Sequence, residues 1–329
     1  MKSIKRIKLF FQEVHHAIKT KNKQALKYGF KKTFIGSKYT DGLLYKTFIY
    51  VMLFSLGYVY LYPMLYMISN SLMSMSDIIS VSVRWIPSSL NWDNYRIIWE
   101  DLNYPRALRD ALILATLPAL SATASSAIVG YGFARFRLPF KKTLMALMIM
   151  AFIIPPQITM LPTFRMYANY ELLGSVRAFV YPALLAQGLN GPIYILIFYS
   201  FFKTIPKSLI ESAQLDGASA FKAFTKIVLP LAIPSIIIVF LFSFVWYYNE
   251  TYLSGLFLRG SDMMTLPLRV SQYINQYTEI YPAGSRAREL FQAVSLAGNI
   301  LALLPLLILY FFTQRHFVES IERTGITGE

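Results

Sequence analysis

The chain has 329 residues, of which 55% are hydrophobic and 15% charged, with a net charge of +15 at pH 7 and a mean hydropathy of +0.45. This composition is typical of a protein that lies in a lipid bilayer and not of a soluble domain. The chain has no cysteine, and its three histidines lie near its two ends. Disulfides, thiolate chemistry and a zinc site are therefore excluded, and we expect no bound metal.

Residues 1–46 form a basic segment with 12 Lys or Arg residues and two acidic residues. In its first 20 residues, apolar side chains recur at intervals of three and four, with lysines between them. This pattern predicts an amphipathic helix on the inner membrane surface, attracted by anionic lipid. A flexible basic tail that only fixes the topology is the alternative. A nucleic-acid partner is not expected, because no groove-reading motif accompanies the charge.

Six uncharged runs are long enough to cross a hydrocarbon core, which is about 30 Å thick and needs roughly 20 helical residues. None alternates like a strand of a β-barrel. We therefore expect an all-α membrane protein, with a six-helix transmembrane domain over residues 47–314. The runs are residues 47–76, 111–134, 143–164, 178–202, 227–249 and 290–314.

Basic residues predict the orientation of these helices. With a cytoplasmic N-terminus, the inner segments hold 22 of the 32 Lys and Arg residues, including every lysine, and the outer segments have no net charge. By the positive-inside rule, both termini are then cytoplasmic. The inner segments are residues 1–46, 135–142, 203–226 and 315–329, the last being a C-terminal tail.

The outer loop of residues 77–110 is too long for a bare hairpin and combines aromatic residues with balanced charge. We expect it to form a small packed cap or a docking surface. A loop that merely covers the helix ends is the alternative.

None of the six runs contains Asp, Glu, Lys, Arg or His. Ion and proton pathways place such groups at membrane depth, so an ion-coupled secondary transporter of a small polar solute is the less favoured alternative. A neutral substrate, or energy supplied from elsewhere, agrees better with these spans. For each candidate substrate-pathway residue an interhelical hydrogen bond is an equal alternative. These candidates are Gln157, Gln187, Asn190, Trp246, Asn249 and Glu250.

Residues 203–229 form the largest inner loop between two spans. Pro206 and Ser208 are expected to begin a helix, with Ser208 and Glu211 as a capping box. Residues 216–217, Asp-Gly, are expected to end that helix. The loop thus begins with a short helix and a turn.

A second helix is expected to begin at Ser219 and to lead into the fifth run. The first helix has an apolar side with no obvious partner in this chain, which indicates a docking surface for another protein. An amphipathic loop lying on the membrane is the alternative. The residues of this apolar side are Leu209, Ile210, Ala213 and Leu215.

The stretch "ESAQLDGASAFKAFTKIVLP", residues 211–230, resembles the EAA loop of binding-protein-dependent ABC importer permeases. That loop has Glu-Ala-Ala, a Gly four residues after the last Ala, nine further residues, and Ile-x-Leu-Pro. Ser212 replaces the usual first Ala. The stretches "LNWDNYRIIW", "YGFARFRLPFKK", "PPQITMLPTF" and "WYYNETYL" are similar to landmarks of MalG-type permeases of carbohydrate importers. The resemblance covers about residues 85–325.

The resemblance implies a type I ABC importer permease fold in the cell membrane, and the import of a carbohydrate, expected to be an oligosaccharide. It implies a second, MalF-type permease, an ATPase dimer and an extracytoplasmic sugar-binding protein as partners. The chain has no G-x-x-x-x-G-K-[ST] loop and no other catalytic constellation, so we expect it to be no enzyme and to bind no cofactor. ATP and Mg would be bound by the partner ATPase.

In this family the first helix of the loop is a coupling helix seated in a cleft of the ATPase. By resemblance, Glu211 makes the polar contact, Ala213 allows close packing, and Gly217 permits the turn. The residues assigned to coupling are Glu211, Ser212, Ala213, Leu215, Asp216, Gly217, Ile227, Leu229 and Pro230.

Overall fold

The structure is a computed structural model that describes residues 36–37, 40–80, 82–83, 85–280 and 284–326. The chain divides into two units, residues 1–69 and residues 70–329. The amphipathic helix expected in the first 20 residues lies outside the described residues. The first unit contains a short antiparallel hairpin of β1 (Gly36–Ser37) and β2 (Thr40–Asp41). It continues into α3 (Leu43–Ser71), a 29-residue helix long and apolar enough to cross a membrane.

The second unit is built around α6 (Tyr104–Arg135), a helix of 32 residues. Small residues let the neighbouring helices approach it closely. At Gly130 an added Cβ would lie 2.7 Å from the Cβ of Phe198, so only glycine allows this contact. The helices that pack on α6 are α9 (Arg177–Leu184), α10 (Gly191–Thr204) and α14 (Ile233–Asn249). Helix α6 also has a stripe of fully buried alanines at four-residue spacing, consisting of Ala107, Ala111, Ala115 and Ala119.

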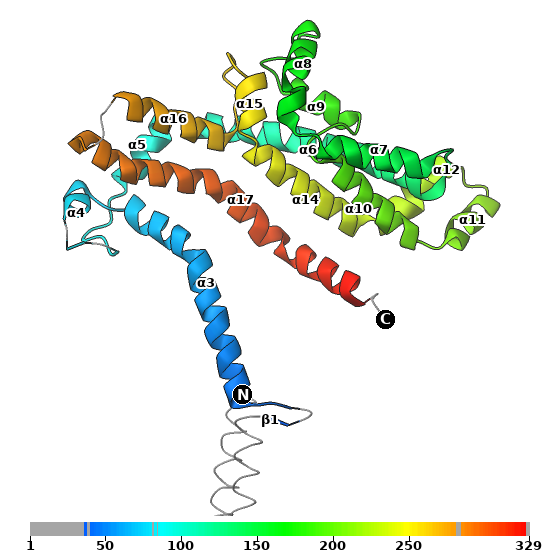
Figure 1. The fold of residues 1–329 in the computed structure, drawn as a ribbon, viewed down its shortest axis with the longest axis horizontal. Coiled ribbons are helices and arrows are strands. Elements are labelled where there is room, and N and C mark those ends of the chain that lie inside the picture. The colour runs from blue at the N-terminus through cyan, green and yellow to red at the C-terminus, as the bar shows by residue number, and fades with distance from the viewer. Residues whose placement is uncertain (1–35, 38–39, 81, 84, 281–283, 327–329) are drawn as a thin grey trace, which may run out of the picture. The chain divides into compact units, whose positions relative to one another are not determined.

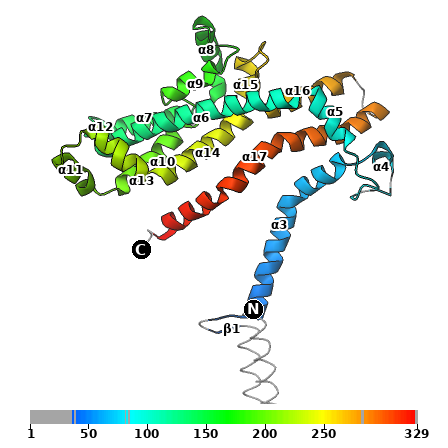
Figure 2. The same cartoon turned by 180° about the vertical axis from the view of Figure 1, so that it is seen from behind.

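The second unit carries short elements at its two ends, which Figures 1 and 2 show from opposite sides. One end holds α4 (Met75–Ile79), α5 (Asp93–Asp101) and α16 (Leu266–Ile280), together with the start of α17 (Arg286–Ile326). The opposite end holds α11 (Lys207–Leu215) and α12 (Ala220–Ala223). The expected outer loop and the expected inner loop thus lie at opposite ends of this unit.

The described part of the loop 77–110 is folded and packed, as expected. Asp77 accepts hydrogen bonds from Ser74 and Ser88, and the side-chain amide of Asn94 donates to the carbonyls of Ser71 and Met73 at 2.9 Å each. Helix α5 packs on α17. The loop is therefore a small cap and not a loose connection.

Three helical segments are each long and apolar enough to cross a membrane, namely α3, α6 and Phe291–Arg315 of α17. Three further bent helix pairs bring the number to six if each pair is one span. The all-α membrane fold is thus confirmed, with three to six candidate spans where six were expected. Three of the expected spans are interrupted or bent.

The run 143–164 is not one helix. It is divided into α7 (Lys141–Ile153) and α8 (Pro156–Asn169), which meet at 93°. Pro155 and Pro156 have no backbone N–H to donate, and the residue before a proline avoids the helical conformation. Ile154 accordingly has an extended ψ of 120°. The two prolines therefore break the span.

The run 178–202 is also interrupted, because α9 ends at Leu184 and α10 begins only at Gly191. Ala186 and Asn190 between them have positive φ angles of 59° and 55°, a conformation that does not continue a right-handed helix. A compact turn therefore lies inside the expected fourth span.

The run 227–249 bends by 76° at Ala232, immediately before α14. Pro234 lies in the first turn of α14, where its missing N–H costs no hydrogen bond. The segment before the bend comprises α12, the π-helical segment η1 (Phe224–Val228) and α13 (Leu229–Leu231).

Candidate functional site

Helix α11 lies at one end of the second unit with one side packed and the other free. Glu211 and Ser212 are exposed, and Leu215 keeps 89% of its surface exposed. Ile210 is 9% exposed and belongs to the hydrophobic core, so the expectation that it has no partner in this chain is wrong. The helix is thus anchored by Ile210, and its opposite side is exposed.

The expected capping box at the start of α11 is also wrong. Pro206 is the N-cap residue, and no side chain caps the helix. Ser208 is the second helical residue, two positions after the N-cap, so its side chain does not occupy the capping position. The carboxylate of Glu211 has no hydrogen bond or ion pair among the described residues. It remains available to a partner.

The end of α11 is a closed left-handed turn at Gly217, whose φ is +82°. The N–H of Ala218 donates to the carbonyl of Ala213 at 2.9 Å, and the N–H of Gly217 donates to that of Gln214 at 3.0 Å. This pair of bonds is the Schellman motif, which satisfies the last carbonyls of a helix. The expected stop at residues 216–217 is confirmed, with Asp216 as the C-cap.

The second helix of the loop begins as expected. The hydroxyl of Ser219 accepts the N–H of Lys222 at 3.2 Å and caps α12. Ile227 and Leu229 are half-buried, whereas Pro230 is exposed. These three residues therefore belong to the return limb that leads to the bend before α14.

Two residues at the end of α6 hold both limbs of this loop, and the sequence analysis assigned no role to either. Arg135 donates from Nη2 to the carbonyls of Phe202 at 2.6 Å and Ile205 at 2.5 Å. The ring of Tyr131 lies 5.5 Å from that of Phe202 and 4.6 Å from that of Phe224. An arginine directly after a long apolar run was the signal in the sequence.

A cavity of about 180 Å³ lies where α8, α9 and the end of α14 meet. Gln187 lines it, as do Pro156 and Tyr247. The N–H of Leu189 donates to the hydroxyl of Tyr247 at 3.1 Å, which holds the turn between α9 and α10 against α14. Sequence reasoning missed Tyr247, because a tyrosine in a helix near the membrane surface is usual.

The other candidate pathway residues lie outside the lining of this cavity. Gln157 is exposed beside Pro156, Asn190 precedes α10 with a φ of 55°, and Trp246 is 55% exposed. The amide of Asn249 donates to the carbonyl of Val245 in its own helix at 3.0 Å. The carboxylate of Glu250 accepts the N–H of Leu253, the second residue of α15 (Tyr252–Phe257), at 2.7 Å.

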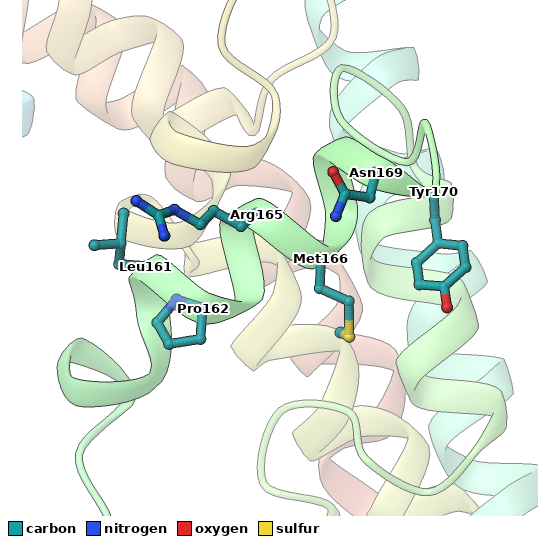
Figure 3. Close-up of a pocket in the computed structure, with 6 residues that line it drawn as sticks. All are labelled: Leu161, Pro162, Arg165, Met166, Asn169 and Tyr170. Atoms are coloured by element: carbon teal, nitrogen blue, oxygen red, sulfur yellow. The ribbon is translucent and has the colours of Figure 1, made fainter.

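A larger hollow of about 680 Å³ runs along α8, where Figure 3 shows the side chains that line it. They all come from one helix and its C-cap residue, so the hollow is an open surface and not an enclosed site. Its residues are Leu161, Pro162, Arg165, Met166, Asn169 and Tyr170. Over the described part of the chain, no group of three His, Asp or Glu residues could hold a metal ion.

Comparison with known proteins places these features in a family. The sequence family described as "Binding-protein-dependent transport system inner membrane component" matches residues 125–323. The osmoprotective compounds uptake permease protein GgtD of Synechocystis sp. is 28% identical over 83% of this chain and 89% of that protein. The maltodextrin transport system permease protein MalD of Streptococcus pneumoniae is 28% identical over 87% of this chain and 96% of that protein.

A solved structure has the same fold. It is that of a bacterial ABC transporter involved in the import of the acidic polysaccharide alginate, and it matches with a TM-score of 0.68 at 18% identity. The match covers 83% of this chain and 96% of that chain. The two chains thus share a fold.

Proposed function

The chain belongs to the binding-protein-dependent transport system inner membrane components, and on this premise we propose that it conducts a carbohydrate and is driven through residues 203–231. It is a permease subunit of an ABC importer, a multi-pass protein of the cytoplasmic membrane, and not an enzyme. Such an importer also comprises a partner permease, an ATPase and a substrate-binding protein. Energy comes from the ATPase, so the ion-coupled alternative is set aside.

Helix α11 is the proposed contact with the ATPase, which would bind ATP and Mg. The observation that carries this proposal is the exposed side of α11, with an unpaired carboxylate at Glu211 and an apolar Leu215 that is 89% exposed. An exposed apolar side chain beside an unpaired charge is the kind of surface that a partner covers. Ser212, Asp216 and the Gly217 turn would lie at the same contact.

The rest of the loop would support this contact from behind. Ala213 is half-buried and small enough for close packing, and the return limb holds Ile227, Leu229 and Pro230. We expect these residues to set the position of α11 and not to touch nucleotide.

The substrate is proposed to be a neutral oligosaccharide. Curated relatives include permeases named for maltodextrin, for arabinooligosaccharides and for melibiose, raffinose and stachyose. The six uncharged runs agree with a neutral solute, because a charged one would need a compensating charge at membrane depth. Gln187 in the cavity is the first proposed contact. Secondary candidates on the pathway are Gln157, Asn190, Trp246, Asn249 and Glu250.

The proposed topology has both termini in the cytoplasm. Residues 1–46 would form a basic inner segment on membrane lipid, residues 47–314 the transmembrane domain, and residues 315–329 a cytoplasmic tail. The permease beside it would be of the MalF type, and a sugar-binding protein would dock outside. The opposite placement of α11 and α5 in the second unit supports this arrangement.

The coupling role is tested with the complex purified from membranes in mild detergent. Glu211→Lys is expected to release the ATPase while the partner permease remains bound, because the substitution reverses the charge at the contact. Glu171→Lys makes the same charge reversal at an exposed residue outside residues 203–231 and should retain the ATPase. Retention of the ATPase by Glu211→Lys would refute the coupling role.

A further inference from the structure

We propose that Tyr131 and Arg135 transmit the movement of the coupling loop to α6, and that Arg135 is the main positioning residue of this importer. The inference rests on the proposed contact between α11 and the ATPase. The two residues are four positions apart, so they lie on one face of the last turn of α6. Together they touch the chain on both sides of α11.

Arg135 fixes the entry to α11. Helix α10 ends at Thr204, and the last carbonyls of a helix have no partner within it. Arg135 donates to the carbonyls of Phe202 and Ile205, and its positive charge suits the negative end of the helix dipole. Ile205 is followed directly by Pro206, the N-cap of α11. A movement of α11 is therefore passed to the guanidinium of Arg135 through Ile205, the residue directly before the N-cap of α11.

Tyr131 fixes the exit. Its ring packs against Phe224, the first residue of η1, and against Phe202 at the end of α10. Phe202 and Phe224 also touch each other, at 6.4 Å between ring centroids. Ala223 beside them is fully buried. The two limbs of the loop are thus joined to each other and to α6, and α11 moves with α6 as one body.

Helix α6 carries this movement toward the cavity. Ser125, ten residues before Arg135 on the same helix, donates its hydroxyl to the carbonyl of Ala183 in α9 at 2.5 Å. Pro182, the neighbour of Ala183, lines the cavity that contains Gln187. One rigid helix thus contacts the coupling loop at one point and a wall of the cavity at another.

The test uses the complete importer in proteoliposomes, with substrate uptake and ATP hydrolysis measured together. Arg135→Met keeps an unbranched, flexible side chain but removes the positive charge and the bonds to both carbonyls. We expect it to retain the ATPase yet to lower the number of substrate molecules imported per ATP by about tenfold, the effect of roughly 1.4 kcal/mol in coupling. Arg135→Lys should recover part of this ratio, since an ammonium can still bond one carbonyl.

Arg137→Met is the matched control. Arg137 is exposed, and the substitution removes the same charge two residues away from Arg135. It should remain within about twofold of the wild type, a change of less than 0.5 kcal/mol. A wild-type ratio in Arg135→Met would overturn the inference. So would loss of the ATPase from that variant, because Arg135 would then serve assembly and not transmission.

A distance measurement covers the case in which Arg135→Met does not fold. The chain has no cysteine, so Ile128→Cys on α6 and Lys222→Cys on α12 provide two exposed positions for spin labels. In the wild-type background their distance should stay the same before and after ATP is trapped. A change in that distance would show that α12 and α6 move separately, against the inference. Failure of Glu211→Lys to release the ATPase would refute the proposed function by itself, whatever Arg135 does.

Discussion

The N–H of Ala218 donates to the carbonyl of Ala213 at 2.9 Å across the turn at Gly217. This bond closes α11 one residue after its C-cap and fixes the direction in which the chain returns to α12. The exposed side of α11 is therefore presented at a set angle and not by a loose loop. The geometry of the coupling loop follows from this turn at one end and from Arg135 at the other.

Gly217→Val is expected to weaken binding of the ATPase. Nothing lies within 4 Å of an added Cβ, so the cost comes from the φ of +82° alone. For a residue with a side chain that conformation costs about 1–2 kcal/mol, or roughly a fivefold to thirtyfold rise in Kd. Titration of the purified permease pair with its ATPase measures this. Gly217→Asn should lose less, because asparagine tolerates the conformation; equal affinities for all three proteins would contradict the role of the turn.

Gly130→Ala is expected to destabilise the permease. The new Cβ would lie 2.7 Å from the Cβ of Phe198 and 3.0 Å from the carbonyl oxygen of Ile195, so α6 and α10 must separate. Overpacking of this kind costs about 1–3 kcal/mol. Gly132→Ala on the same helix is the control, because its Cβ would meet nothing closer than 3.9 Å. In detergent, the thermal unfolding temperature of Gly130→Ala should lie below that of the wild type, and that of Gly132→Ala at or above it. The reverse order would refute the close packing of α6 on α10.

Asp77→Asn is expected to loosen the outer cap in a pH-dependent manner. The hydroxyl of Ser88 donates to the Asp77 carboxylate and lowers the pKa of that carboxyl below its usual value of 3.8. A lowered pKa stabilises the fold above the unfolded pKa of about 3.9 and ceases to do so as the pH falls through the folded pKa. Asp77→Asn should therefore differ from the wild type at pH 7 and differ less at pH 3, which is below the unfolded pKa.

Hydrogen exchange of residues 85–94 measures this effect in detergent. Asp93→Asn serves as the control, since Asp93 pairs only with exposed Arg96 and such pairs contribute little. If the hydrogen-exchange rates of Asp77→Asn and the wild type differ equally at both pH values, the carboxylate charge does not hold the cap.

Gln187→Leu is expected to impair import without affecting assembly. Gln187 is exposed and lines the cavity, so its loss removes a hydrogen-bonding group from the proposed path. Loss of one hydrogen bond to a hydroxyl costs about 0.5–1.5 kcal/mol, or a twofold to tenfold rise in the substrate concentration for half-maximal uptake. Gln157→Leu, outside the cavity lining, should change uptake less. A larger effect of Gln157→Leu than of Gln187→Leu would indicate that the substrate path runs along α8 and not past Gln187.

Much of the fold was predictable from the sequence. The uncharged runs identified the spans, since hydropathy needs no tertiary information. The breaks in the spans at Pro155 and at residues 185–190 were harder to predict, because a proline bends some membrane helices and interrupts others according to its neighbours. Apolarity alone could not show that the run 178–202 contains a turn with two positive φ angles.

The coupling loop was partly predictable. The end of α11 at Gly217 and the start of α12 at Ser219 follow from local chemistry, and both are confirmed. The burial of Ile210 and the clamp at Arg135 depend on residues far away in the sequence, and no local pattern contains them. Arg135 meets Ile205 across 70 positions, a contact that only the packing of α6 on α10 creates.

The most direct measurement is a crosslink from α11. Leu215→Cys gives this cysteine-free chain a single, 89% exposed thiol, which a photoactivatable maleimide can label in the assembled importer. Illumination should join this chain to the ATPase subunit, whereas the same label at Ile128→Cys on α6 should not. A crosslink from Leu215→Cys to the substrate-binding protein, or to no protein while Ile128→Cys reaches the ATPase, would contradict the account.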